Sequence, residues 1–210
     1  VDAFMPDAVA RNSIRKELAI PDDAPVIGMA ARFEPIKDHE NFVRAARILY
    51  RTGSNVHFVL CGHGVSWDSE TLARWIDDAG IRHRFHLLGL RNDMSSITAA
   101  FDIATLTSFG EAFPNVVGEA MSCAVPCVVT DVGDTARIVG ETGTVVPSRN
   151  PDALAAAWGE MLDLGPEGRC QLGMAARERV KENFSLPKIV DWYQNIFEEL
   201  AYVARHERAL

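Results

Sequence analysis

The stretch that decides the fold is residues 24–62, APVIGMAARFEPIKDHENFVRAARILYRTGSNVHFVLCG. It opens with an apolar run at 24–32 that lacks a polar face, which is typical of a strand buried on both sides. Residues 38–53 then carry apolar side chains at intervals of three and four, which predicts a helix that ends at Gly53. An apolar strand follows at 55–62. Strand, helix and strand in this order predict a crossover between parallel strands.

The same alternation continues along the chain to residue 147. Further short strands are predicted at 84–89, 102–108, 125–130 and 143–147, and helices at 69–80, 93–101 and 115–123. From Pro151 onward the pattern is helical, and it closes in a terminal helix at 185–205. We therefore predict one α/β domain over residues 1–210. It is Rossmann-like, with a parallel sheet of about six strands, helices on both faces and a helical C-terminal tail.

The bulk composition fits a globular domain, since 48% of the 210 residues are hydrophobic and the formal net charge is -8. No cluster of Lys and Arg provides a footprint for nucleic acid, so nucleic acid is not an expected partner. No apolar run is long enough to span a bilayer. Because the chain begins with Val, we expect a processed product or an excised fragment.

The cysteines have no paired spacing, and three of the four lie in or beside apolar patterns, which predicts buried free thiols and a reducing compartment. They are Cys61, Cys123, Cys127 and Cys170. We accordingly expect a cytoplasmic protein, and leave open whether the full-length protein is peripheral to the inner membrane.

Several polar or glycine residues fall where the predicted strands end. Arg32 and Lys37 follow the first strand, Gly62 the second, Arg91 the third and Glu111 the fourth. In an open parallel sheet, ligands bind outside the carboxyl ends of the strands. We therefore expect these loops to meet at one rim of the sheet.

The stretch GEAFPNVVGEA (110–120) adds a helix start to this rim. The helix is predicted to begin at Pro114 or Asn115, which leaves the amides of residues 115–117 without acceptors inside the helix. Such amides, together with the helix dipole, bind anions such as phosphate. A diphosphate fits a site that combines this helix end with the guanidinium of Arg32 and the ammonium of Lys37.

The two acids of the stretch fit the groups on either side of a diphosphate. Glu119 shares a helix face with Asn115, and its carboxylate can hold two hydroxyls of a ribose. Glu111 lies in the loop and can reach a sugar. Taken singly, each of these charges fits a solvated surface, and Glu119 also favours the helix dipole. Their joint placement at strand ends favours a shared site.

The histidines and acids give no indication of a metal. His39, His63 and His86 lack the spacing of metal ligands, and no Asp-x-Asp pair occurs. We expect neither a metal nor another cofactor.

The chain resembles the carboxyl-terminal, donor-binding half of the large retaining glycosyltransferase family of the GT-B fold (family 4). The resemblance extends from VDAFMP (1–6) to ENFSLPKIVDWYQNIFEEL (182–200), and its most specific part is a Glu-x7-Glu signature from Glu111 to Glu119. Arg32 and Lys37 match the basic pair that binds the donor diphosphate.

The resemblance implies that a nucleotide-diphosphate sugar is the donor, and that the sugar passes to an acceptor hydroxyl with retained configuration and without a required metal. Glu111 would face the donor sugar, and Arg32 and Lys37 would stabilise the leaving diphosphate. The other implied donor contacts are the glycine loop at Gly62, the base-contacting loop at Arg91, the amides of Phe113, Asn115 (the neighbour of Pro114) and Val116, and Glu119 at the ribose.

The sequence departs from the family pattern in two places and lacks half of the enzyme. Ala112 stands where the family usually has Gly, and Gly133, Asp134 and Arg137 stand where relatives often carry Gly-Gly and a Glu. The amino-terminal domain, which supplies acceptor binding, has no counterpart. The acceptor therefore stays open between a glycan, a lipid carrier and a small molecule, and we expect the chain alone to turn over little or nothing.

Two other functions fit the same residues. The chain could be a non-catalytic subunit that binds a nucleotide-sugar for a partner, or an epimerase-like domain for nucleotide-sugars, although the sequence offers no convincing acid and base pair for the latter. The sequence specifies neither the donor sugar and base nor the oligomeric state.

Overall fold

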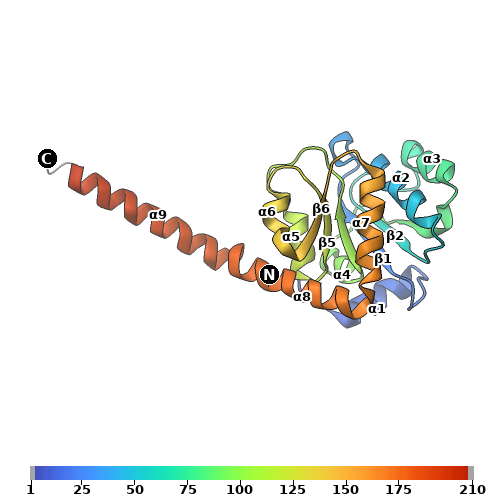
Figure 1. The fold of residues 1–210 in the computed structure, drawn as a ribbon, viewed down its shortest axis with the longest axis horizontal. Helices are drawn as coiled ribbons and strands as arrows, with labels where there is room; N and C mark the ends of the chain where they lie inside the picture. The colour runs from blue at the N-terminus through green and yellow to red at the C-terminus, as the bar shows by residue number, and fades with distance from the viewer. Residues whose placement is uncertain (1–2, 208–210) are drawn as a thin grey trace.

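Six parallel strands form one sheet in the order β3-β2-β1-β4-β5-β6 (Figure 1). The computed structural model describes residues 3–207. The strands are β1 (Val26–Ala30), β2 (His57–Cys61), β3 (Phe85–Leu87), β4 (Ile103–Leu106), β5 (Cys127–Thr130) and β6 (Gly143–Val146). The predicted parallel sheet of about six strands is therefore confirmed.

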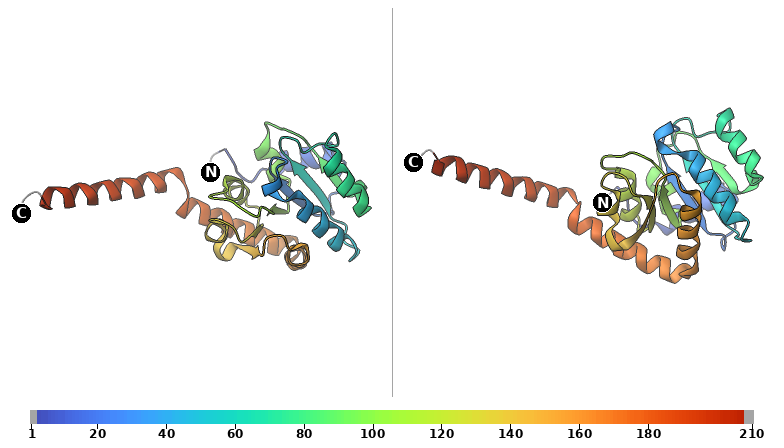
Figure 2. Two further views of the ribbon diagram at one scale, coloured as in Figure 1. Left: turned by 90° about the horizontal axis from the view of Figure 1, so that it is seen from above. Right: turned by 45° about the horizontal axis from the view of Figure 1, so that its top comes forward.

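Helices cover both faces of the sheet, as also predicted (Figure 2). One face carries α2 (His39–Tyr50), α3 (Glu70–Ala79) and α7 (Pro151–Asp163). The other face carries α1 (Ala8–Glu17), α4 (Met94–Ala99), α5 (Asn115–Ser122), α6 (Thr135–Val139) and α8 (Gly165–Asn183). Short 3-10 turns lie at η1 (Pro35–Lys37), η2 (Arg82–Arg84) and η3 (Gly140–Thr142).

Two of these helices, α1 and α6, were not predicted from the sequence. The residues of α1 are mostly polar, so they do not show a helical pattern of apolar side chains. Ion pairs as well as apolar contacts hold this helix to the domain. Arg11 and Arg15 lie 2.8 and 3.4 Å from the carboxylate of Asp102. The side chain of Asp7 caps the helix by accepting a hydrogen bond from the amide of Ala10 at 2.9 Å. The helix α6 has five residues, too few for periodicity to show.

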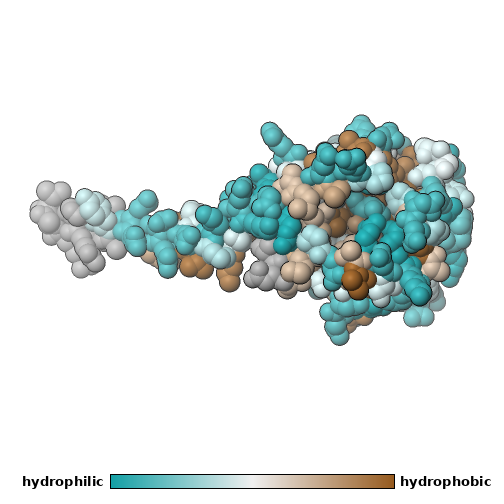
Figure 3. All heavy atoms as spheres, turned by 90° about the horizontal axis from the view of Figure 1, so that it is seen from below, coloured by the Kyte–Doolittle hydropathy of each residue, from teal (hydrophilic) through white to brown (hydrophobic). Residues whose placement is uncertain are grey.

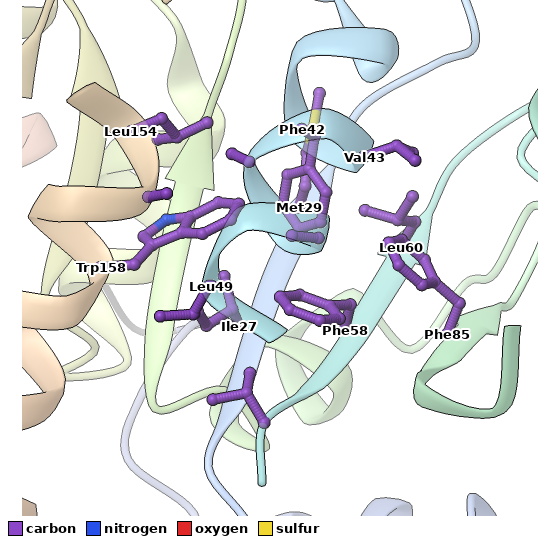
Figure 4. Close-up of a cluster of buried hydrophobic side chains, with 14 of the residues drawn as sticks. Ile27, Met29, Phe42, Val43, Leu49, Phe58, Leu60, Phe85, Leu154 and Trp158 are labelled. Carbon is purple, nitrogen blue, oxygen red and sulfur yellow. The ribbon is translucent and has the colours of Figure 1, made fainter. Parts of the chain in front are cut away.

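An aromatic cluster forms the core beneath α2 and α7 (Figure 4). The ring of Phe42 lies 5.9 Å from that of Phe58 and 5.0 Å from that of Trp158, and all three side chains are fully buried. The indole N–H of Trp158 donates to the hydroxyl of Thr105 at 2.9 Å, so burial does not leave this N–H unsatisfied. These contacts fix α2, and with it the loop that precedes α2.

The strand order reverses between β1 and β4, because the chain builds β1, β2 and β3 to one side and then returns to β4 on the other. Such a reversal leaves a crevice at the carboxyl ends of the two strands. Gly62 allows the loops after β1 and β2 to touch there, because a Cβ atom at Gly62 would lie 2.1 Å from the carbonyl oxygen of Ala31.

The last helix, α9 (Leu186–Glu207), projects away from the sheet (Figures 1 and 2). It covers the segment predicted as a helical tail. Large apolar side chains are exposed along it, and Figure 3 shows such residues on one side of the projection. They include Leu186, Val190, Trp192, Tyr193, Phe197 and Leu200. None of the helices within residues 3–207 combines the length and the apolar character that a membrane crossing requires.

Candidate functional site

A cleft of about 400 Å³ opens at the carboxyl ends of β1 to β4. All ten residues that the sequence analysis singled out line this cleft. They are Arg32, Lys37, Gly62, Arg91, Glu111, Phe113, Pro114, Asn115, Val116 and Glu119. The fold therefore brings together loops that are up to 87 residues apart in the chain, from residue 32 to residue 119.

Lys37 and Arg32, the two cations that the sequence assigns to a diphosphate, have carboxylate partners in this structure. The ammonium of Lys37 lies 2.5 Å from Oε1 of Glu111, and both side chains are mostly buried. The guanidinium of Arg32 lies 3.2 Å from Glu34, and its side chain is 67% exposed. An anion that enters the cleft would compete with Glu111 for Lys37 and with Glu34 for Arg32. Neither ion pair was predicted from the sequence.

The N-terminus of α5 faces the cleft, and the helix begins at Asn115 with Pro114 as its cap residue. One expectation needs correction here. The amide of Val117 donates to the carbonyl of Pro114 at 3.1 Å, so it is not free to bind a ligand. The first-turn amides of Asn115 and Val116 still lack acceptors within the helix.

Glu119 is partly buried at the cleft, and no residue within 3–207 donates a hydrogen bond to its carboxylate. Burial raises its pKa above the usual value for a glutamate, because desolvation disfavours the charged form. A partly buried acceptor without a donor is suited to bind ligand hydroxyls.

The turn that carries Glu111 is held from below by the loop after β5. A Cβ atom at Gly133, where φ is +53°, would lie 2.4 Å from the carbonyl oxygen of Glu111. The amide of Asp134 donates to the carbonyl of Ala112 at 2.9 Å. The sequence did not predict a role for this loop; in the structure it supports the Glu111 turn.

The methyl group of Ala112 does not strain that turn. Within residues 3–207, positive φ at non-glycine residues occurs at Ala19, Asp38, Ala124 and Arg149, and Ala112 is not among them. The backbone at Ala112 therefore does not require glycine.

Two side chains at the edge of the cleft are fixed by contacts outside it. Arg91 donates to Asp93 at 2.7 Å and to Glu17 of α1 at 2.7 Å, and these hydrogen bonds raise the pKa of its guanidinium. The ring of Phe113 lies 5.8 Å from that of Phe184, which separates α8 from α9. The cleft thus borders α1 and the α8–α9 junction.

A larger cleft of about 590 Å³ lies on the other side of the loop after β1, and nothing in the sequence analysis indicated it. It is bounded by α2, α3 and the loops after β4 and β6. Its distinctive side chains are aromatic and basic, namely Phe33, Trp75, Phe109, Arg44 and Arg149.

The cysteines and possible metal ligands complete the description of the reactive groups. Cys61, Cys123 and Cys127 are buried free thiols, as predicted, whereas Cys170 is exposed. Burial raises the pKa of Cys61 to about 11 and that of Cys123 to about 12, so both stay protonated at neutral pH. Over residues 3–207, no three His, Cys, Asp or Glu side chains gather closely enough to hold a metal ion.

Comparison with known proteins gives a family match and several relatives. The family described as "Glycosyl transferases group 1" matches residues 24–163. The D-inositol 3-phosphate glycosyltransferase of Corynebacterium glutamicum (strain R) is 29% identical over 175 residues, which cover 80% of this chain and 42% of that protein. The N-acetyl-alpha-D-glucosaminyl L-malate synthase of Bacillus anthracis is 28% identical over 190 residues, which cover 89% of this chain and 49% of that protein. The chain thus spans about half or less of the length of these relatives.

Solved structures share the fold. A glycosyltransferase from Rickettsia africae ESF-5 matches 95% of this chain and 55% of its own with a TM-score of 0.84 at 20% identity. Anabaena HepE in complex with UDP matches 96% of this chain and 55% of its own with a TM-score of 0.82 at 22% identity.

Proposed function

The chain belongs to the group 1 glycosyl transferases, and from that premise we propose that it is the donor-binding half of a glycosyltransferase. In this proposal the complete enzyme is a retaining transferase of family 4 that moves a sugar from a nucleotide-diphosphate sugar to an acceptor hydroxyl. The observation that supports it best is the cleft itself, where two cations, a helix N-terminus and two carboxylates converge.

Each part of the donor has a matching group in the cleft. The diphosphate binds Arg32, Lys37 and the first amides of α5, and the carboxylate of Glu119 accepts hydrogen bonds from the ribose. Glu111 faces the transferred sugar. Because Lys37 is paired with Glu111 at 2.5 Å before the donor arrives, donor binding moves this ammonium toward the phosphates.

The same cations act on the reaction. When the bond to the sugar breaks, negative charge grows on the departing diphosphate, and Arg32 and Lys37 stabilise that charge. Groups preorganised at a site of developing charge contribute a factor on the order of 10²–10³ in rate for each hydrogen-bond donor. We propose that they do so without a metal or another cofactor, which addition of EDTA to a transfer assay would test.

The relatives suggest a first nucleotide to test. Anabaena HepE has been solved with UDP, with UDP and glucose, and with UDP-glucose. Because that protein shares the fold over 96% of this chain, UDP and UDP-glucose are the first probes. GDP and ADP, each with its sugar conjugate, complete the panel because the cleft does not specify the base.

The acceptor binds outside this chain in our proposal. The chain covers 42% and 49% of two curated relatives, which leaves room for a second half of similar size. A glycan, a lipid carrier or a small molecule would bind there, and the chain alone would bind donor but transfer little or no sugar.

We propose a cytoplasmic location, with peripheral contact between the longer protein and the inner membrane as the alternative. The three buried free thiols support a reducing compartment. Fractionation of cells, followed by a high-salt wash of the membrane fraction, distinguishes the two locations.

Calorimetry with the nucleotide panel tests donor binding. Arg32→Ala and Lys37→Ala should weaken the binding of nucleoside diphosphates, whereas Lys181→Ala, which removes an exposed cation on α8, should not. Unchanged affinity in both cleft variants would remove the diphosphate assignment.

A transfer assay with the longer protein tests the reaction. Transfer with a retained anomeric centre, observed by NMR, is the expected result. Donor binding without transfer would favour the non-catalytic subunit, and conversion of the donor into an isomeric nucleotide-sugar would favour an epimerase.

A further inference from the structure

We propose that Thr107 and Ser108, the two residues directly after β4, are positioning residues that fix Lys37 and Glu111 in the cleft. The inference rests on the proposed function, because it assigns roles toward the same donor. Both side chains are fully buried, at 0% exposure, so neither touches a ligand directly. Each hydroxyl instead donates to one of the charged residues of the cleft.

The hydroxyl of Ser108 donates to Oε1 of Glu111 at 2.6 Å. The ammonium of Lys37 donates to the same oxygen at 2.5 Å. Within residues 3–207, no group donates to the other oxygen, Oε2. One carboxylate oxygen is therefore occupied by two donors, and the other keeps its full capacity to accept from a hydroxyl of the donor sugar.

Ser108 keeps this bond when Lys37 leaves. If the ammonium moves to an incoming diphosphate, Oε1 still accepts from a buried hydroxyl that cannot follow. Glu111 then retains its orientation at the moment when the sugar arrives. A carboxylate without that bond would be free to rotate, and its alignment would have to be gained during binding.

Thr107 acts on the backbone of the other loop. Its hydroxyl donates to the carbonyl of Lys37 at 2.6 Å, and the amide of Phe109 donates to the carbonyl of Ile36 at 3.0 Å. These two bonds join the loop after β1 to the loop after β4. The main chain of Lys37 is thereby held while its side chain stays free to exchange partners.

The pair is itself held by the next strand. The hydroxyl of Thr130, at the end of β5, donates to the carbonyl of Ser108 at 2.6 Å, and that of Thr135 donates to the carbonyl of Thr130 at 2.6 Å. Buried hydroxyls thus link α6, β5 and the cleft without using charge. This arrangement predicts two separate effects. Ser108 affects the binding of the donor sugar, and Thr107 affects the binding of the diphosphate.

Binding measurements on the intact chain test these two effects. Ser108→Ala should weaken UDP-glucose binding about 10-fold, because it removes the hydrogen bond that orients Glu111 toward the sugar. The affinity for UDP, which has no sugar at Glu111, should change by less than about twofold. Thr107→Val should weaken UDP and UDP-glucose by the same factor, about 3- to 10-fold. The control for Ser108 is Ser122→Ala, which removes a buried hydroxyl at the far end of α5. The control for Thr107 is Thr52→Val, which removes a hydroxyl-to-carbonyl bond at 2.7 Å from an exposed residue. If the nucleotide panel identifies another base, the same comparison uses that nucleotide and its sugar conjugate.

A double-mutant cycle shows whether Ser108 acts through Glu111. In a Glu111→Gln background, Ser108→Ala should weaken UDP-glucose binding by less than a further factor of about two, because the carboxylate that Ser108 orients is already absent. Additive losses would overturn the positioning role while leaving the proposed function intact.

One readout does not depend on any ligand. The ¹³C signal of the Glu111 carboxylate, assigned by its disappearance in Glu111→Gln, should shift in Ser108→Ala and stay in place in Ser122→Ala. If the wild-type chain bound none of the nucleotides, the proposed function would fail, and this signal would still test the contact. An unchanged signal in Ser108→Ala overturns the inference.

Discussion

The two clefts at the carboxyl edge of the sheet are neighbours, but their lining residues differ in chemistry. They lie on either side of the loop after β1, and the one without predicted residues is the larger, at about 590 against about 400 Å³. In the larger cleft, as in the smaller one, the cations have partners within the protein. Arg44 pairs with Glu40 at 2.5 Å, and Arg149 lies 4.0 Å above the ring of Phe109.

The smaller cleft differs because it combines a helix N-terminus with a carboxylate that has no hydrogen-bond donor in the described part of the chain. The first amides of α5 have no acceptor within the helix, and Glu119 has no donor among residues 3–207. Binding sites combine a concave pocket with a small number of convergent polar groups. The larger cleft also holds unpaired polar atoms, since the buried side chains of His39 and Asn41 have no hydrogen-bond partner among residues 3–207. What sets the smaller cleft apart is its combination of helix amides, cations and carboxylates, which is the set that our proposal assigns to the donor.

The largest expected effect is a charge reversal that breaks this contrast. Lys37→Glu should weaken UDP binding by more than about 100-fold, because it replaces an attraction for phosphate with a repulsion inside the cleft. Arg44→Glu makes the same change in the larger cleft and should alter UDP affinity less than about twofold. Calorimetry on both variants measures the difference, and comparable losses would mean that the two clefts are not functionally distinct.

A smaller effect is expected at Glu119. Glu119→Gln should weaken UDP binding about 10-fold, because a carboxylate accepts hydrogen bonds from two ribose hydroxyls more strongly than an amide does. The loss should be much smaller for 2′-deoxyuridine diphosphate, which lacks one of those hydroxyls. Equal losses for the two nucleotides would place Glu119 away from the ribose.

The raised pKa of Glu119 gives this variant a pH signature. The folded chain holds the proton more tightly than the unfolded chain, so ionised Glu119 costs stability above its folded pKa, and that cost disappears as the pH falls through it. Glu119→Gln should therefore raise the melting temperature by about 1–3 °C at neutral pH, and the gain should shrink toward acid pH. Melting curves between neutral and acid pH would show it, and a gain that grew on acidification would contradict the assigned cause.

A modest gain is expected from Glu34→Gln. Removing this carboxylate frees Arg32 from its partner at 3.2 Å, and the freed guanidinium should strengthen UDP binding about twofold. The gain should vanish in an Arg32→Ala background. A gain that persisted without Arg32 would reflect a general change in charge.

The smallest effect is expected from Ala112→Gly, which introduces the residue that the family resemblance led us to expect at this position. Because the backbone at Ala112 does not require positive φ, glycine should leave UDP affinity within about twofold and cost about 0.5–1 kcal/mol of folding free energy. Calorimetry and denaturant titration measure the two quantities. Much tighter UDP binding would show that the methyl group obstructs the α5 amides.

Local patterns predicted the strands and the residues at their ends, because apolar periodicity and the Glu111-to-Glu119 spacing are properties of short segments. The prediction failed where tertiary contacts decide. The ion pair between Lys37 and Glu111 joins residues 74 apart, and α1 is held in part by its arginines at Asp102. The Pro114 cap, which removes the amide of Val117 from the site, depends on a backbone geometry that the sequence left open between two starts.

The ring contact between Phe113 and Phe184 has a practical consequence for anyone who trims the projecting helix. The apolar side chains exposed along α9 make its removal attractive for crystallisation. A stop codon placed at the end of α8, after Asn183, would delete an aromatic neighbour of the cleft wall along with the helix. A cut after Ser185 keeps that neighbour and discards α9 entirely.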